Sequence, residues 1–129
     1  MRMLVRVLAG FVGCLGLAVA LTAWLRPESI AGSLGLVITN PTGLATIRAD
    51  IGGFFGASGI FAVLAAVHGR PQYVLAALLL QCFAIAGRLV NIAFVGWSFN
   101  FLTPISIEAV VIALFFMAYR TLATTDTFS

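Results

Sequence analysis

The chain has 129 residues, of which 62% are hydrophobic and 9% are charged, with seven basic and four acidic side chains. A soluble domain has roughly 25% charged residues. A soluble fold of this chain would leave much of its apolar surface exposed to water, at a free-energy cost of about 25 cal/mol per Å². The composition therefore excludes a soluble or disordered chain, and the net charge of +3 is too small to indicate a nucleic-acid partner. We expect a single integral membrane domain over residues 1–129.

Four apolar runs follow one another, each long enough to cross a ~30 Å hydrocarbon core as a helix. They predict transmembrane helices at about residues 3–25, 44–67, 72–97 and 101–119. The prolines all fall at the ends of these runs: Pro27, Pro41, Pro71 and Pro104. The runs are continuously apolar rather than alternating, which favours helices over a barrel. The predicted fold is an all-α bundle of four transmembrane helices.

Arginine alone indicates the orientation, because the chain has no lysine. An orientation with both termini in the cytoplasm places four arginines there: Arg2, Arg6, Arg70 and Arg120. It leaves Arg26 and Arg48 on or near the other side, so the positive-inside tendency favours N-in and C-in. Arg2 and Arg6 before an apolar run are also compatible with a signal peptide, but the run is longer than usual, and we expect an uncleaved first span.

The loop between the first two spans, residues 26–43, is expected to lie at the outer surface. It carries apolar residues at helical spacing: Ile30, Leu34, Val37 and Ile38. They predict a short interfacial helix.

Charges inside the spans are the most informative feature. Arg48, Asp50, Arg88 and Glu108 fall in or near the outer half of the predicted bilayer, where an unpaired Arg or Asp costs about 2.5–3.5 kcal/mol. Arg48 and Asp50 are about 200° apart around a helix, so they should address different partners. We expect Asp50 to pair with Arg88 and Arg48 with Glu108, with exchanged partners as the alternative.

The third span carries a polar stripe. Gln81, Arg88 and Asn91 are spaced by seven and three residues, so they share one helix face that should point into the bundle. On the second span Gly52, Gly56 and Gly59 form a small-residue face, which in lipid favours close helix packing over a ligand role.

Signatures of enzymatic chemistry are lacking. Cys14 and Cys82 do not form a redox motif, and His68 lies in a tight turn beside Gly69. No pattern indicates a catalytic residue, a metal site or a cofactor. The charged residues Arg48, Asp50, Arg88 and Glu108, with Gln81 and Asn91, are therefore interpreted either as a network that fixes helix register or as a ligand or ion site.

Residues 46–59, with Arg48 and their glycines, followed by Gly87-Arg88 and then Glu108, resemble a bacterial family of small membrane proteins. The family is grouped as domain of unknown function 4345, with a more distant similarity to DoxX-like four-helix proteins. The resemblance covers nearly the whole chain and implies four helices in the bacterial inner membrane and a trio of Arg48, Arg88 and Glu108. It supplies no activity. Ile51 stands where the family usually has an aromatic residue, and Asp50 lies outside the family pattern.

Three functions are compatible with these features. The leading hypothesis is a small accessory or ligand-binding membrane protein that holds a lipid, a quinone or a similar amphiphile beside the charged residues. The second is an ion- or proton-coupled transporter or channel, built as a homo-oligomer because four helices hardly enclose a pathway alone. The third is a structural subunit of a larger membrane complex.

Overall fold

The computed structural model describes residues 1–126, and its regular elements are all helices. The long ones are α1 (Arg2–Leu25), α4 (Gly52–His68), α5 (Pro71–Val95) and α6 (Leu102–Asp126). Four helical segments are long and apolar enough to cross a membrane: Arg2–Leu25, Pro41–His68, Pro71–Val95 and Phe99–Thr124. The predicted four-helix fold is thus confirmed, with the second segment beginning earlier and the fourth ending later than expected.

The second segment is built from three helical pieces. α3 (Pro41–Thr46) begins where the Asn40 side chain accepts a hydrogen bond from the Gly43 N–H at 2.9 Å, and a five-residue π-helical turn, η1 (Ile47–Ile51), joins it to α4. α4 ends at Gly69, whose φ of +65° is the left-handed conformation that glycine adopts readily. π-Turns inside helices are rare and often lie at functional sites, and this one contains Arg48 and Asp50.

The segment between the first two spans contains one short helix, α2 (Pro27–Ser33). Of the four apolar residues expected on an interfacial helix, only Ile30 lies within it. Leu34 is its C-cap, while Val37 and Ile38 lie in the non-helical stretch before α3. The prediction of one helix through all four is wrong, and the left-handed Gly35 (φ +70°) just after α2 explains the break.

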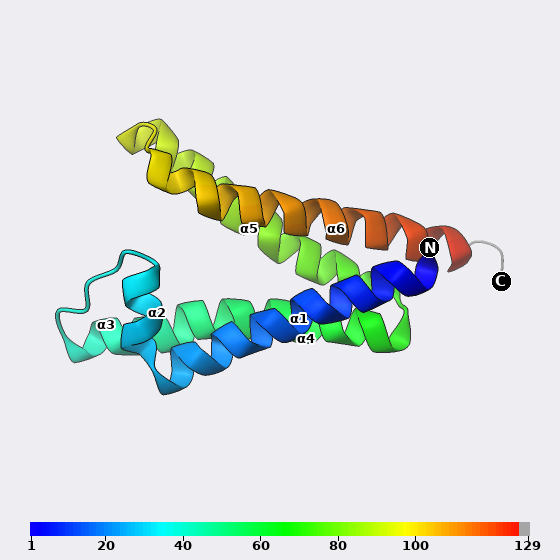
Figure 1. Ribbon diagram of the computed structural model, residues 1–129, viewed down its shortest axis with the longest axis horizontal. Helices are drawn as coiled ribbons and strands as arrows, with labels where there is room; N and C mark the ends of the chain where they lie inside the picture. The colour runs from blue at the N-terminus through cyan, green and yellow to red at the C-terminus, as the bar shows by residue number, and fades with distance from the viewer. Residues whose placement is uncertain (127–129) are drawn as a thin grey trace.

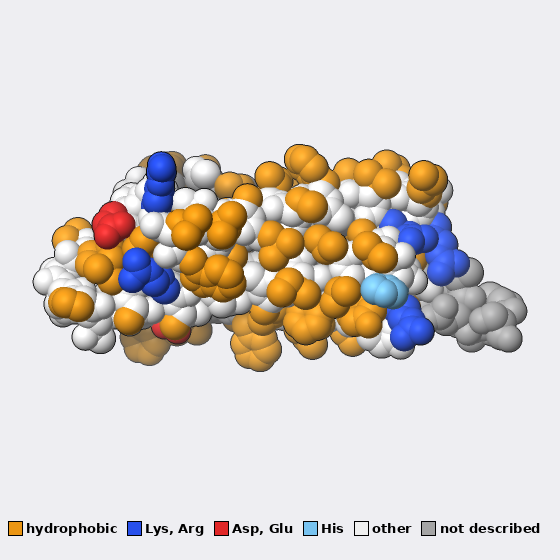
Figure 2. Space-filling model, turned by 90° about the horizontal axis from the view of Figure 1, so that it is seen from below, with side chains coloured by type: hydrophobic (Ala, Val, Ile, Leu, Met, Phe, Trp, Pro, Cys, Tyr) orange, Lys and Arg blue, Asp and Glu red, His pale blue; other side chains and the backbone are white. Residues whose placement is uncertain are grey.

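The helices form two pairs, α1 with α4 and α5 with α6. The pairs meet at the end that holds the N-terminus and the α4–α5 turn, and they diverge toward the end that holds α2, α3 and the α5–α6 connection (Figure 1). The buried core lies where they meet, and it includes Val5 and Ala9 of α1, Val74 of α5 and Phe115 of α6. On the face seen in Figure 2, hydrophobic side chains cover the length of the molecule between charged groups near its two ends.

Glycines hold α1 and α4 in close contact. A Cβ added to Gly59 would lie 2.8 Å from the Gly13 carbonyl oxygen, and one added to Gly13 would lie 2.9 Å from the Gly59 carbonyl oxygen. Gly56 faces Ala20, and Gly52 lies directly beneath the indole of Trp24. The three glycines of the predicted packing face are buried against α1, which allows the two backbones to approach as closely as in small-residue interfaces of membrane helices.

Candidate functional site

An ion pair joins the two helices of the second pair. Arg88 of α5 donates from Nε to both carboxylate oxygens of Glu108 of α6, at 2.8 Å to Oε1 and 2.9 Å to Oε2. The Arg88 side chain is 37% exposed and that of Glu108 is 14% exposed. The two charges neutralise one another within the apolar part of the chain, where either alone would be unfavourable.

The arrangement leaves donors on Arg88 unused. Both bonds to Glu108 come from Nε, and within residues 1–126 neither Nη nitrogen of Arg88 has a hydrogen-bond partner. No fully buried side-chain nitrogen or oxygen in that part of the chain lacks a partner, so these Nη groups are accessible. They can donate to an oxygen atom of a bound molecule.

A cleft of about 320 Å³ opens between the two helix pairs and includes this ion pair in its lining. Its walls are mainly apolar side chains such as Val12 of α1, Phe55 of α4 and Val111 of α6. A second cavity of about 570 Å³ adjoins it, since the same Arg88 and Glu108 line both. Leu34, Phe54 and Phe55 are also shared between the two. The ion pair therefore stands where two apolar spaces meet.

A second polar contact lies in the cleft lining. Gln81 of α5 donates from Nε2 to the Ser58 hydroxyl of α4 at 3.2 Å, and the two residues are 8% and 5% exposed. This bond crosses between the helix pairs, whereas the bond from Arg88 to Glu108 lies within one pair. Both polar contacts involve the predicted stripe on α5.

The expected four-charge cluster is not formed among the described residues. The predicted pairings of Asp50 with Arg88 and of Arg48 with Glu108 are wrong, and of the exchanged alternative only the pair of Arg88 with Glu108 is formed. Arg48 instead donates from Nε to the Trp24 carbonyl oxygen at 3.0 Å, and the Trp24 indole N–H donates to the Arg48 carbonyl oxygen at 3.0 Å. Asp50 is exposed and has no ion pair within residues 1–126. The reason is geometric: η1 packs on α1 and α2, while α5 and α6 diverge from α1 and α4 toward this end.

The polar stripe on α5 also ends earlier than expected. Gln81 is buried and Arg88 is half-buried, but Asn91, one turn further, is exposed and has no side-chain hydrogen bond within the described range. The expectation that Asn91 faces the interior is wrong, because α5 and α6 have by then moved away from the other pair (Figure 1).

Two residues of the site were not expected from the sequence. Ser58 gives no periodic signal by itself, although a hydroxyl inside an apolar span could have been matched with Gln81. The other is Trp24, whose indole N–H donates to the carbonyl oxygen of Arg48 within the π-turn, and the sequence does not reveal that turn. Within residues 1–124, no group of three or more His, Cys, Asp or Glu side chains is arranged to hold a metal ion.

Residues 4–119 match the family model described as Domain of unknown function (DUF4345), which confirms the resemblance noted in the sequence, and the chain belongs to this family. Neither the curated proteins nor the solved structures contain a match to the chain.

Proposed function

We propose that this DUF4345 protein is a small multi-pass protein of the bacterial inner membrane that binds an amphiphile such as a lipid or a quinone. The apolar tail occupies the cleft between the helix pairs, and an oxygen of the head group accepts hydrogen bonds from the Nη groups of Arg88. The observation that carries this proposal is the placement of Arg88, with unused donors, where two apolar cavities meet.

The charge balance at the site selects for an amphiphile. Glu108 neutralises Arg88, so a small free anion gains little from the site, and binding must draw on apolar contacts as well. The volumes of about 320 and 570 Å³ lie within the usual range for ligand pockets of roughly 300–1,000 Å³. A ligand with an apolar tail and a hydrogen-bond-accepting head satisfies both requirements.

The proposed orientation has both termini in the cytoplasm. The end where the helix pairs meet carries Arg2 and Arg6 near the N-terminus and Arg70 in the α4–α5 turn, while Arg26 and Arg48 lie at the other end. The larger number of arginines at the end with the N-terminus supports a cytoplasmic position for that end, by the positive-inside tendency. The cleft then opens in the outer half of the bilayer, beneath α2 and the segment that follows it.

Mass spectrometry of lipids and quinones that co-purify with the full chain in a mild detergent tests the proposal. The informative variant is the double substitution Arg88→Gln and Glu108→Gln, which removes the charges without leaving one unpaired. We expect a defined amphiphile in the wild type and its loss in this variant.

The matched control is Arg26→Gln with Glu28→Gln, an equal change of charge on exposed residues outside the cleft. It should retain the amphiphile. Equal retention by both double variants, or no enrichment of any amphiphile over bulk membrane lipid in the wild type, would contradict the proposal.

A further inference from the structure

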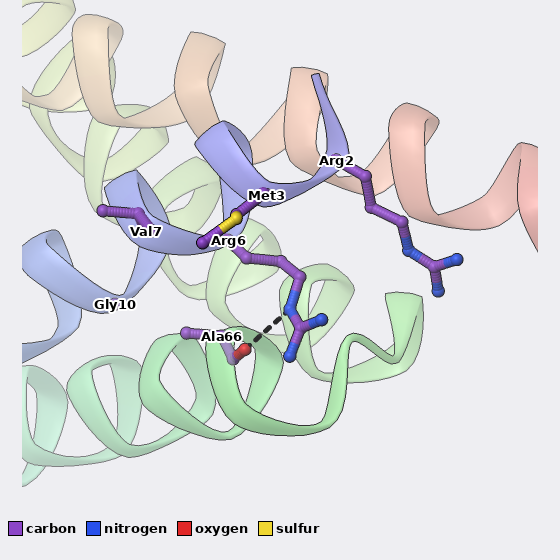
Figure 3. Close-up of a pocket in the computed structure, with 6 residues that line it drawn as sticks. All are labelled: Arg2, Met3, Arg6, Val7, Gly10 and Ala66. Carbon is purple, nitrogen blue, oxygen red and sulfur yellow. Dashed lines mark hydrogen bonds between the residues drawn. The ribbon is translucent and has the colours of Figure 1, made fainter.

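A groove at the opposite end of the molecule is independent of the cleft. It lies between the start of α1 and the end of α4, has a volume of about 490 Å³, and is lined by Arg2, Met3, Arg6, Val7, Gly10 and Ala66 (Figure 3). Its lining combines two arginines with apolar or small residues and contains no acidic side chain. Such a surface is cationic at one end and apolar along its length.

Arg6 is held in place by the end of α4. It donates from Nε to the Ala66 carbonyl oxygen and from Nη2 to the Val67 carbonyl oxygen, each at 2.8 Å. A Cβ on Gly69 would lie 3.5 Å from its guanidinium, so the glycine turn closes beside this group. The carbonyls at a helix C-terminus carry partial negative charge, which explains why this arginine is fixed here.

Arg2 lies one helical turn before Arg6, on the same face of α1. It is exposed and has no hydrogen bond or ion pair within the part of the chain that the structure describes. Figure 3 shows the Arg6 side chain reaching the end of α4 and the Arg2 side chain extending from the start of α1 with its guanidinium unattached. The second guanidinium is therefore available to a ligand beside a first one that is already positioned.

The apolar part of the groove runs from these arginines toward the middle of α1. Met3 and Val7 form its side, and Gly10 faces Ala66, whose Cβ would lie 3.0 Å from a Cβ at position 10. Met3 and Val7 are themselves exposed, so they would contact lipid in a membrane. A chain lying along these residues would have its polar end at Arg2 and Arg6.

We propose that this groove is a binding site for an anionic phospholipid, with the phosphate between Arg2 and Arg6 and an acyl chain along Met3 and Val7. Arginine recognises phosphate through several donors at once, and basic pockets between membrane helices on the cytoplasmic side are suited to anionic head groups. The occupant is a lipid rather than a soluble phosphate because the apolar wall continues directly from the charged end.

The test compares thermal unfolding of the detergent-solubilised full chain with added phosphatidylglycerol, phosphatidylcholine or inorganic phosphate. We expect phosphatidylglycerol alone to raise the unfolding midpoint. Arg2→Gln, which breaks no bond of the described fold, should weaken phosphatidylglycerol binding by about fivefold, the effect of one arginine near an anionic surface.

Arg26→Gln is the matched control, because it removes one exposed arginine at the other end of the chain. It should respond to phosphatidylglycerol like the wild type. An equal weakening in both variants would show general charge attraction and overturn the proposal. So would equal stabilisation by phosphatidylcholine, or stabilisation by inorganic phosphate alone.

Discussion

The two ends of this molecule are built on different packing principles. At the end with the N-terminus, small and apolar residues such as Ala9, Ala62 and Ala118 bring all four helices into one buried core. Toward the other end, the helix pairs diverge, and Phe54, Phe55 and the ion pair of Arg88 and Glu108 line open space. The same four apolar segments run through both ends, so the size of side chains and the position of charges distinguish the closed end from the open one.

The same contrast holds between the helix pairs. α1 and α4 approach through Gly13 and Gly59, with backbone atoms in near contact, whereas α5 and α6 are joined across a side-chain ion pair. The glycine contact between α1 and α4 involves backbone packing, whereas the ion pair between α5 and α6 leaves the Nη donors of Arg88 available to other partners. The following substitutions separate these two kinds of contact.

Arg88→Ala should have the largest effect. It leaves the Glu108 carboxylate, 14% exposed, without its partner, and we expect a loss of about 3 kcal/mol in the free energy of unfolding, at the low end for a broken buried pair because Arg88 is partly exposed. Unfolding in detergent, followed by circular dichroism, measures this loss.

The partner assignment has its own control. Adding Glu108→Ala to Arg88→Ala should recover most of the stability, whereas adding Asp50→Ala should recover none, since Asp50 has no ion pair within residues 1–126. Recovery with Asp50→Ala would mean that Arg88 pairs with that residue in the membrane.

Gly59→Ala tests the closed pair. Its methyl group would lie 2.8 Å from the Gly13 carbonyl oxygen, so α1 and α4 must move apart, and we expect a loss of about 2 kcal/mol in the same unfolding measurement. Gly53→Ala on the same helix is the control, because a Cβ there meets nothing within 4 Å. Equal losses at the two positions would show that the contact with Gly13 is not the cause, because the higher helix propensity of alanine acts in the opposite direction at both.

Trp24→Phe should have a smaller effect. It removes the indole N–H that donates to the Arg48 carbonyl oxygen and keeps an aromatic ring over Gly52, so we expect a loss of about 1 kcal/mol. Trp97→Phe is the comparison, since the indole of Trp97 has no hydrogen bond within the described residues. If both variants were equally stable, the bond from the Trp24 indole to the Arg48 carbonyl oxygen would have no energetic role.

The four-helix fold could be predicted from the sequence because it depends on the length of apolar runs and on prolines at their ends. Those properties are local, and a run of about 20 apolar residues is long enough to cross the bilayer as one helix. The inward position of Gln81 and Arg88 follows from helical spacing in the same way. Asn91 departs from it because spacing alone gives no information on where two helix pairs diverge.

The sequence left two charge pairings open and could not decide between them, because the choice depends on how far apart the elements lie in space. From sequence position alone, Arg48 and Asp50 are expected at a similar depth in the membrane to Arg88. In the structure their segment, the π-turn, packs on α1, and Arg48 bonds to the Trp24 carbonyl oxygen. A π-turn has no clear sequence signature. By sequence position, two arginines, Arg48 and Arg88, are expected at a depth from which they could pair with Glu108. The side chain on the adjacent helix, Arg88, is the one that reaches it.

The central claim is that the cleft between the helix pairs holds an amphiphile, and filling the cleft tests it most directly. Val111 lines the cleft, whereas its neighbour Val110 is 67% exposed and lies outside the lining. Native mass spectrometry of the folded Val111→Trp and Val110→Trp variants compares the same added indole inside and outside the cleft. We expect the bound amphiphile to be lost with Val111→Trp and retained with Val110→Trp. Retention of the amphiphile in both variants would contradict the assignment of the cleft as its site.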